Sequence, residues 1–223
     1  MQIDKYFSKI HEFILDVFIP LNKGQKYLKN IDLEEFLSLT EKAEIPPIKD
    51  TISILNYKNK LVKEAIWSLK FKNNQKIAKL FAQIIYDVLV EELGDLKLSI
   101  NFDKPILITI PMTRKKQRER GYNQVNLIAQ ELAKLDNNNS FEYQKNILKK
   151  TRETLPQSRI RNKKDRKDNL KGCFKVIMPK RIKNRNIILL DDVLTSGATI
   201  QEVVSTLKKS RLPKKIMAIT LAH

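Results

Sequence analysis

The chain has 223 residues, of which 42% are hydrophobic, which is enough for one α/β domain with a small appendage. Its 43 lysines and arginines outnumber its 25 aspartates and glutamates, and the net charge of +18 predicts attraction to polyanions such as nucleic acid, phosphorylated metabolites or an anionic surface. A single cysteine, Cys173, excludes an intrachain disulfide framework and a thiolate zinc site, and neither a secretory signal nor a membrane-spanning stretch is visible, so we expect a cytoplasmic protein.

Residues 1–50 give weak signals for regular structure. Apolar residues spaced along one helical face predict a helix over residues 6–17, and a second helix is expected over residues 32–43. The Pro-Pro pair that follows breaks any helix. The expected organisation is therefore an appendage over residues 1–50 and a main domain over residues 51–223.

Clearer helical patterns begin after residue 60. Apolar residues at helical spacing predict one amphipathic helix over residues 61–69 and another over residues 77–89, with an Asn-Asn turn between them. Trp67 and Phe71 lie in the first pattern and are expected to be core residues rather than ligand-stacking groups.

Strands and helices alternate in the rest of the chain. Helical spacing recurs over residues 122–135 and 199–209, between short apolar runs that are rich in β-branched residues. Alternation of this kind indicates an α/β fold with a doubly wound parallel sheet flanked by helices. The expected strands are residues 105–110, 173–177, 186–190 and 216–221.

Residues 186–200, NIILLDDVLTSGATI, join a buried strand to a polar loop and a helix. Ligands of doubly wound sheets bind beyond the carboxyl ends of the strands, where Asp191 and Asp192 are expected. Their carboxylates can accept hydrogen bonds from vicinal ribose hydroxyls, or hold water around a divalent cation. Hydroxyl groups, free amides and the helix dipole can hold a phosphate where the loop becomes helix. The residues expected to do so are Thr195, Ser196, Gly197, Ala198 and Thr199.

Two other interpretations of this junction are open. The Asp, Thr and Ser side chains could serve only as caps at a strand–turn–helix junction. A receiver domain also ends a strand in an aspartate, but it has much more chain after that residue than the 31 residues that follow Asp192 here. A Walker A sequence and a GxGxxG motif are both absent from the sequence, which argues against nucleotide hydrolysis and dinucleotide binding.

A basic block, TRKKQRERG at residues 113–121, follows the 105–110 strand and therefore also lies at a carboxyl edge. Arginine forks in such a block can neutralise a pyrophosphate through bidentate contacts. The alternative is a solvated run of charges. Asn123 and Gln124, at the start of the next helix, could face the same ligand.

Residues 144–185 contain 16 basic and 3 acidic residues, which contribute +13 of the net charge of +18. A positive groove of this kind could bind single-stranded DNA, although Phe174 is the only aromatic residue in the segment on which a base could stack. Many of the lysines could equally be solvated surface residues. Cys173 is flanked by apolar residues and is expected to be a small core residue.

The sequence LLDDVLTSGAT resembles the phosphoribosyl pyrophosphate (PRPP) motif of type I phosphoribosyltransferases. Three more blocks resemble the ComF family, which is associated with DNA uptake competence, and they occur in the family's order. Together the four blocks cover approximately residues 60–223. The three further blocks are AIWSLKFKNNQKIAKLFA at 65–82, IPMTRKKQRERGYNQVNLIAQELA at 110–133 and TRETLPQSRIRNKKDRKDNLKGCF at 151–174.

The resemblance implies a type I phosphoribosyltransferase-like sheet with PRPP and magnesium as ligands. The metal would be held mainly by PRPP, close to the aspartate pair and without direct protein ligands. The basic block would be the pyrophosphate-side loop, and residues 144–185 would contain a mobile lid that excludes water. The residues that the resemblance implies as catalytic are Asp191, Asp192, Arg114 and Arg120, and those that it implies as ligand-binding are Asp191, Asp192, Thr195, Ser196, Gly197, Ala198, Thr199, Arg118 and Arg166.

The chain departs from the ComF pattern at its beginning. ComF proteins usually open with a zinc ribbon built on four cysteines, whereas this sequence has no cysteine before Cys173. We therefore expect no zinc, and we expect residues 1–50 to be a metal-free remnant of the ribbon or a helical segment.

Three hypotheses about function follow from these observations. The first is a PRPP-binding protein of the ComF type that is linked to DNA uptake and transfers phosphoribosyl to an unknown acceptor. The second is a non-catalytic accessory protein that binds single-stranded DNA through the basic surface. The third is a salvage phosphoribosyltransferase for a nucleobase. The sequence leaves the oligomeric state open.

Overall fold

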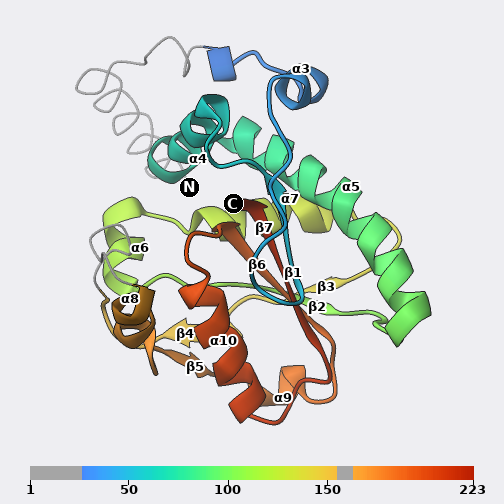
Figure 1. Cartoon of the computed structure of the whole chain (residues 1–223), viewed down its shortest axis with the longest axis vertical. Coiled ribbons are helices and arrows are strands. Elements are labelled where there is room, and N and C mark those ends of the chain that lie inside the picture. The colour runs from blue at the N-terminus through green and yellow to red at the C-terminus, as the bar shows by residue number, and fades with distance from the viewer. Residues whose placement is uncertain (1–26, 155–162) are drawn as a thin grey trace, which may run out of the picture.

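A computed structural model describes residues 27–154 and 163–223, so the helix expected over residues 6–17 lies outside the described part. Five parallel strands form one sheet (Figure 1), which confirms the predicted α/β class. The order across the sheet is β1-β7-β6-β2-β3, with Leu107 opposite Ile188 and Asp191 opposite Thr220 in the register. The strands are β1 (Thr51–Leu55), β2 (Ile106–Thr109), β3 (Glu142–Tyr143), β6 (Ile187–Val193) and β7 (Ile216–Ala222).

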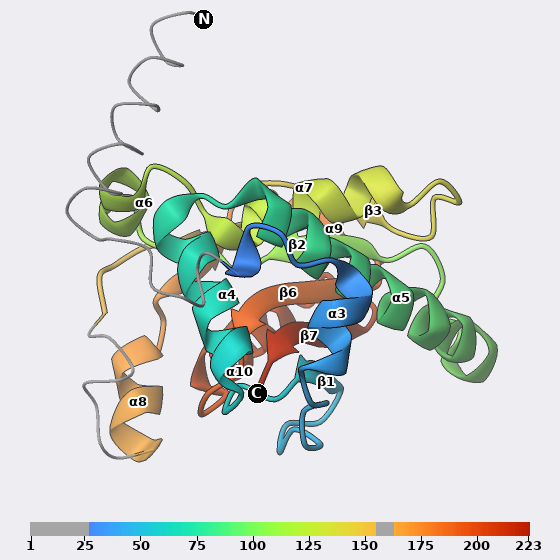
Figure 2. The ribbon, with the colours of Figure 1, turned by 90° about the horizontal axis from the view of Figure 1, so that it is seen from above.

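Helices and a small hairpin cover the two faces of the sheet, as Figures 1 and 2 show. One core joins alternate strand residues, such as Ile188 and Ile219, to the helices of one layer. A second core joins the intervening residues, such as Ile187 and Leu189, to the other layer. The first layer contains α3 (Leu33–Ser38), α4 (Lys60–Lys72), α5 (Gln75–Ile100) and α7 (Gln124–Leu135), and the second contains α8 (Lys163–Leu170), α9 (Pro179–Ile182), α10 (Ala198–Lys209), β4 (Leu148–Lys150) and β5 (Phe174–Val176).

The helix expected over residues 32–43 is only α3. Asp32 caps its amino terminus by accepting a hydrogen bond from the Glu35 amide. The chain then extends along the sheet edge, where the Ala43 amide donates to the Ile54 carbonyl over 2.9 Å. Strand β1, which the sequence analysis did not include, provides that edge. The buried Leu28, Ile31 and Phe36 belong to the same core as α4 and α5, so the described part of the chain before residue 50 packs on the sheet domain.

The basic block is a helix, α6 (Arg114–Arg120), and the expectation of a loop was wrong. Thr113 caps the amino terminus by accepting from the Lys116 amide over 3.3 Å, and Gly121 ends the helix with a positive φ of 83°. None of the seven helical residues is buried, so the two caps define the element and the core does not.

Strands β4 and β5 form an antiparallel hairpin at the base of the segment that the resemblance implied to be a lid. The predicted strand over residues 173–177 is confirmed as β5. Cys173 is fully buried in the second core, which confirms its predicted place.

Candidate functional site

Strand β6 carries the aspartate pair at its carboxyl end, where it runs three residues beyond the predicted end at residue 190 and finishes at Val193. Successive strand residues point in opposite directions. Asp192 therefore points towards the layer of α4 and α7 and is buried, with 7% of its surface exposed. Asp191 points the other way and is half-buried.

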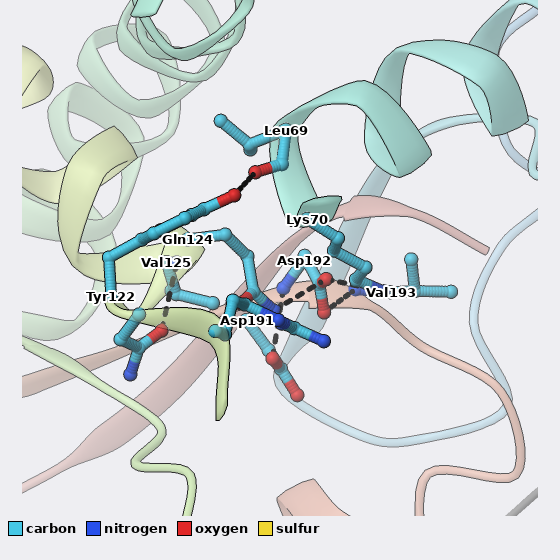
Figure 3. Close-up of polar contacts among 10 residues, drawn as sticks. Leu69, Lys70, Tyr122, Gln124, Val125, Asp191, Asp192 and Val193 are labelled. Carbon is cyan, nitrogen blue, oxygen red and sulfur yellow. Dashed lines mark hydrogen bonds and ion pairs between the residues drawn. The ribbon is translucent and has the colours of Figure 1, made fainter. Parts of the chain in front are cut away.

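Asp192 is held by side chains from two helices (Figure 3). Lys70 Nζ of α4 lies 2.7 Å from Asp192 Oδ2, and Gln124 Nε2 of α7 donates to the same oxygen over 3.0 Å. The other oxygen, Oδ1, accepts the Val193 amide over 2.9 Å. Both oxygens of Asp192 are thus engaged within the protein, and the residue is better suited to positioning Lys70 and Gln124 than to binding a ligand directly.

The environment sets opposite protonation tendencies for the two aspartates. Burial alone would raise the pKa of Asp192, but the charge of Lys70 and the hydrogen bonds from Lys70 and Gln124 outweigh burial and lower it. Burial would likewise lower the pKa of Lys70, yet the charge of Asp192 raises it. Burial, together with the negative charge of Asp192, raises the pKa of Asp191 well above the ordinary carboxyl value.

Asp191 keeps one carboxylate oxygen available. Its Oδ1 accepts the Asp192 amide over 2.9 Å, and no side chain in the described part of the structure donates to Oδ2. An ionised oxygen in this position lacks the donors that would offset its burial. A ligand that brings hydroxyl groups or a cation to Asp191 would supply them.

The loop after β6 leads into an uncapped helix. Gly197 is the amino-terminal cap of α10, with φ of 72°, and no side chain among the described residues makes a capping hydrogen bond there. The interpretation of the Asp, Thr and Ser residues as mere caps is therefore wrong for this helix. The first-turn amides have no partner within a helix and carry the positive end of its dipole. Around them, Thr195 is exposed, Ser196 and Thr199 are half-buried, and Gly197 and Ala198 are buried.

Position 197 requires glycine for two reasons: there is no room for a side chain, and the backbone φ is positive. A Cβ atom at this position would lie 1.8 Å from Ile48 Cδ1, and L side chains rarely adopt a φ of 72°. Ile48, from the segment before β1, therefore packs directly against the loop.

Helix α6 contributes unequally to the site. Arg120 donates to Gln124 Oε1 and so joins the network of Asp192. Arg114 and Arg118 are exposed on α6, and no contact joins them to the aspartates. The side chain of Arg166 lies outside the described part of the structure, although its backbone belongs to α8.

Lys70 and Tyr122 belong to the site, and the sequence analysis did not single them out. Tyr122 Oη donates to the Leu69 carbonyl over 2.7 Å and accepts the Asn73 amide over 2.8 Å, and so ties the start of α7 to the end of α4 (Figure 3). This contact fixes the turn of α4 that carries Lys70. The available signal was the Leu-Lys-Phe triplet at residues 69–71, inside a block that resembles the ComF family.

The prediction that Phe71 is a core residue was wrong, because 48% of its surface is exposed. Its ring lies 5.4 Å from that of the half-buried Trp67, and the Arg120 guanidinium lies 5.2 Å from the Phe71 ring centre. The last turn of α4 thus presents an aromatic face beside the basic helix α6.

The described residues contain neither a cluster of metal-binding side chains nor a helix that could span a membrane. Among residues 27–154 and 163–223, no group of three or more His, Cys, Asp or Glu side chains is placed to hold a metal ion. No helix within these ranges is long and apolar enough to cross a membrane.

Curated proteins with related sequences carry names that refer to competence or to DNA utilization. The chain is 31% identical over 166 residues to Competence protein F of Haemophilus influenzae, which covers 73% of this chain and 69% of that protein. It is 25% identical to DNA utilization protein YhgH of Escherichia coli K12, over 74% of this chain and 68% of that protein. It is 23% identical to Competence protein ComFC of Bacillus subtilis, over 78% of this chain and 64% of that protein.

Other comparisons are less informative. No protein-family model matches the chain. A solved hypoxanthine phosphoribosyltransferase from Staphylococcus aureus aligns with a TM-score of 0.37 and 13% identity, over 63% of each chain. A TM-score of this size supports no conclusion about the chain, and the family assignment rests on the sequence relatives.

Proposed function

The chain belongs to the family of Competence protein F, and from this premise we propose that it binds PRPP with magnesium at the β6–α10 junction. The observation that carries the proposal is the uncapped amino terminus of α10 directly after the aspartate pair. Free amides and a positive dipole end favour a phosphate there, and the names of the relatives support a role in competence.

The 5′-phosphate of PRPP would be held by the loop. The first-turn amides of α10 would donate to it, and Gly197 would allow the backbone to approach. The hydroxyl groups of Thr195, Ser196 and Thr199 would add further donors.

Asp191 would accept the ribose hydroxyls, because its Oδ2 is open to a ligand while Asp192 is engaged by Lys70 and Gln124. Hydroxyl donors at this oxygen would offset the cost of its burial. The same oxygen fits a metal-bound water, so Asp191 would influence a magnesium ion carried by PRPP. The metal, when bound, supplies charge neutralisation of the pyrophosphate.

The pyrophosphate would lie towards α6. Arg120, which is held in place by Gln124, would neutralise it together with Arg114 and Arg118, and Arg166 would act from α8. Transfer of phosphoribosyl would then depend on positioning and on cationic stabilisation of the leaving group, because no general base is evident. The acceptor is open.

Titration calorimetry with PRPP and magnesium tests the proposal. Wild-type protein is expected to bind, and the double variant Asp191→Asn/Asp192→Asn is expected to lose most of the affinity. A control variant, Asp95→Asn, changes an exposed carboxylate of α5 and should bind as the wild type does. Undiminished affinity in the double variant would falsify the proposal. Pyrophosphate release only in the presence of one free base would identify the chain as a salvage enzyme.

A second candidate function, binding of single-stranded DNA, is favoured by the aromatic face of α4. Exposed Phe71, flanked by Trp67 and Arg120, gives a base a ring on which to stack beside a basic helix. Stacking is worth about 1–3 kcal/mol per base, so Phe71→Leu should weaken binding of a short oligonucleotide at least fivefold. Leu98→Ala, on the exposed end of α5, is the matched control. Equal affinities in a gel shift of the wild type and both variants would exclude this face.

A further inference from the structure

A separate cavity of about 340 Å³ opens beyond the carboxyl end of β2. Helix α6, the start of α7 and the β4–β5 hairpin form its walls. None of its lining residues comes from β6 or from the 195–199 loop, so it lies beside the junction to which PRPP is assigned above and shares only Arg114 with the residues proposed to bind PRPP. Its volume lies within the range of about 300–1,000 Å³ that is typical of small-molecule sites.

Two side-chain amides present unpaired donors in this cavity. Asn123 Oδ1 accepts the Val125 amide over 3.0 Å, and Asn126 Oδ1 accepts the Thr109 hydroxyl over 2.6 Å. These bonds fix the orientation of both amides, with Nδ2 as the remaining group. No acceptor for either Nδ2 atom exists among the described residues, although Asn123 is only 7% exposed. The cavity therefore offers two oriented N–H donors for a ligand that carries acceptors.

The remaining walls combine positive charge with apolar surface. Arg114, Lys149 and Lys150 line the cavity, and no acidic side chain from the described part of the chain does. Leu148 and the exposed Ile177 provide apolar contacts. A ligand that satisfies all these groups has a planar ring with carbonyl or ring-nitrogen acceptors, and it also has an anionic group.

We propose that this cavity binds a nucleotide, with the base against Leu148 and Ile177, its acceptors on the amides of Asn123 and Asn126, and its phosphate on Arg114, Lys149 and Lys150. A free nucleoside monophosphate and the terminal nucleotide of a DNA strand share this chemistry. The inference goes beyond PRPP binding. The two proposals share Arg114, but the aspartate pair and the α10 amino terminus take no part in the nucleotide site.

Titration calorimetry of the full chain tests the site with four deoxynucleoside monophosphates and a 5′-phosphorylated tetranucleotide. Asn123→Asp and Asn126→Asp keep the oxygen that accepts from Val125 or Thr109 but replace the free donor by an acceptor. Each is expected to weaken binding at least tenfold without lowering the melting temperature. Gln130→Glu adds the same charge one turn further along α7 and is the matched control.

The possible results distinguish a free nucleotide from the end of a DNA strand, and both from the absence of a nucleotide site. Binding of a monophosphate that depends on both asparagines supports a free nucleotide, and binding of the tetranucleotide alone with the same dependence supports a strand end. The Asp191→Asn variant, which leaves the contact between Asp192 and Gln124 in place, should bind either probe as the wild type does, even if PRPP binding fails. Equal affinity for inorganic phosphate, no binding of any probe, or unchanged affinity in both asparagine variants would overturn the inference.

Discussion

Lys70 Nζ lies 2.7 Å from Asp192 Oδ2, and this ion pair joins helix α4 to the carboxyl end of β6. Only 24% of the lysine side chain and 10% of the aspartate side chain are exposed. Gln124 completes the contact from α7. The pair therefore links the helical layer to the strand that carries the candidate site, so a change in either partner should affect both stability and ligand binding.

Breaking the ion pair from one side should be costly. Asp192→Asn leaves a largely buried ammonium group without its counter-charge, and Lys70→Met leaves the carboxylate, so each should lower the free energy of unfolding by about 3 kcal/mol. The double variant Lys70→Met/Asp192→Asn should lose less than the sum, because it leaves neither charge unpaired. Urea unfolding of all four proteins measures the coupling, and strictly additive losses would contradict the importance of the pair.

The pair also predicts the pH range in which it stabilises the fold. Because the pKa of Asp192 is lowered from 3.8, its contribution is present above that value and is lost as the pH falls through the folded-state pKa. Because the pKa of Lys70 is raised from 10.5, its contribution is present below that value and is lost as the pH rises through the folded-state pKa. Asp191, whose pKa depends on the charges of Lys70 and Asp192, is replaced by Asn in both proteins for this comparison. In that background the stability difference made by Lys70→Met/Asp192→Asn should be flat from about pH 4 to 10 and should shrink outside that range. A difference that changes steadily across the neutral range would be inconsistent with this assignment.

Substitution of Asp191, unlike that of Asp192, should increase the stability of the fold while it weakens ligand binding. Its pKa in the folded protein is higher than in the unfolded chain, so ionisation of Asp191 at neutral pH lowers the free energy of unfolding. Asp191→Asn keeps an oxygen for the Asp192 amide and removes that cost, so the melting temperature at pH 7 should rise while affinity for PRPP falls. Scanning calorimetry and titration calorimetry on the same sample test both parts. A variant that is less stable at pH 7 and binds PRPP normally would refute the role given to Asp191.

The stability cost of substituting Gly197 has a backbone part and a packing part, which can be measured separately. Gly197→Ala should cost about 1–2 kcal/mol from the left-handed conformation alone, plus the displacement of Ile48. Gly172 has a similar φ of 69° with nothing within 4 Å of an added Cβ, so Gly172→Ala measures the backbone part alone. Ile48→Ala in the Gly197→Ala background should recover the packing part. Equal unfolding free energies for the two glycine variants would mean that Ile48 does not constrain the loop.

Local patterns were sufficient to predict strands β2, β6 and β7 of the sheet, the loop after β6 and helices α4, α5, α7 and α10, but not the edge strands β1 and β3. The strand around residues 187–190 and the amphipathic helix α10 have periodicities that burial enforces, and Asp191 and Asp192 are adjacent in the chain. Their placement at a carboxyl edge follows from the topology of a parallel sheet.

The partner of Asp192 could not be predicted in the same way. Helical spacing assigns Lys70 to a face of α4, but only the packing of α4 against the sheet brings it to β6. Phe71 was assigned to the core because it is apolar, yet it lies in the last turn of α4, which ends at Lys72, and 48% of its surface is exposed while Leu69 in the same turn is buried. Helix α6 has no apolar face to give a periodic signal, and only Thr113 and Gly121 mark its ends.

The most direct test of the PRPP site is a crystal structure of this chain with PRPP and magnesium. We predict that the 5′-phosphate accepts hydrogen bonds from the first-turn amides of α10 and that the ribose hydroxyls lie against Asp191 Oδ2. Asp192 should still pair with Lys70. A complex in which PRPP contacts α6 but leaves the amino terminus of α10 free would contradict the account.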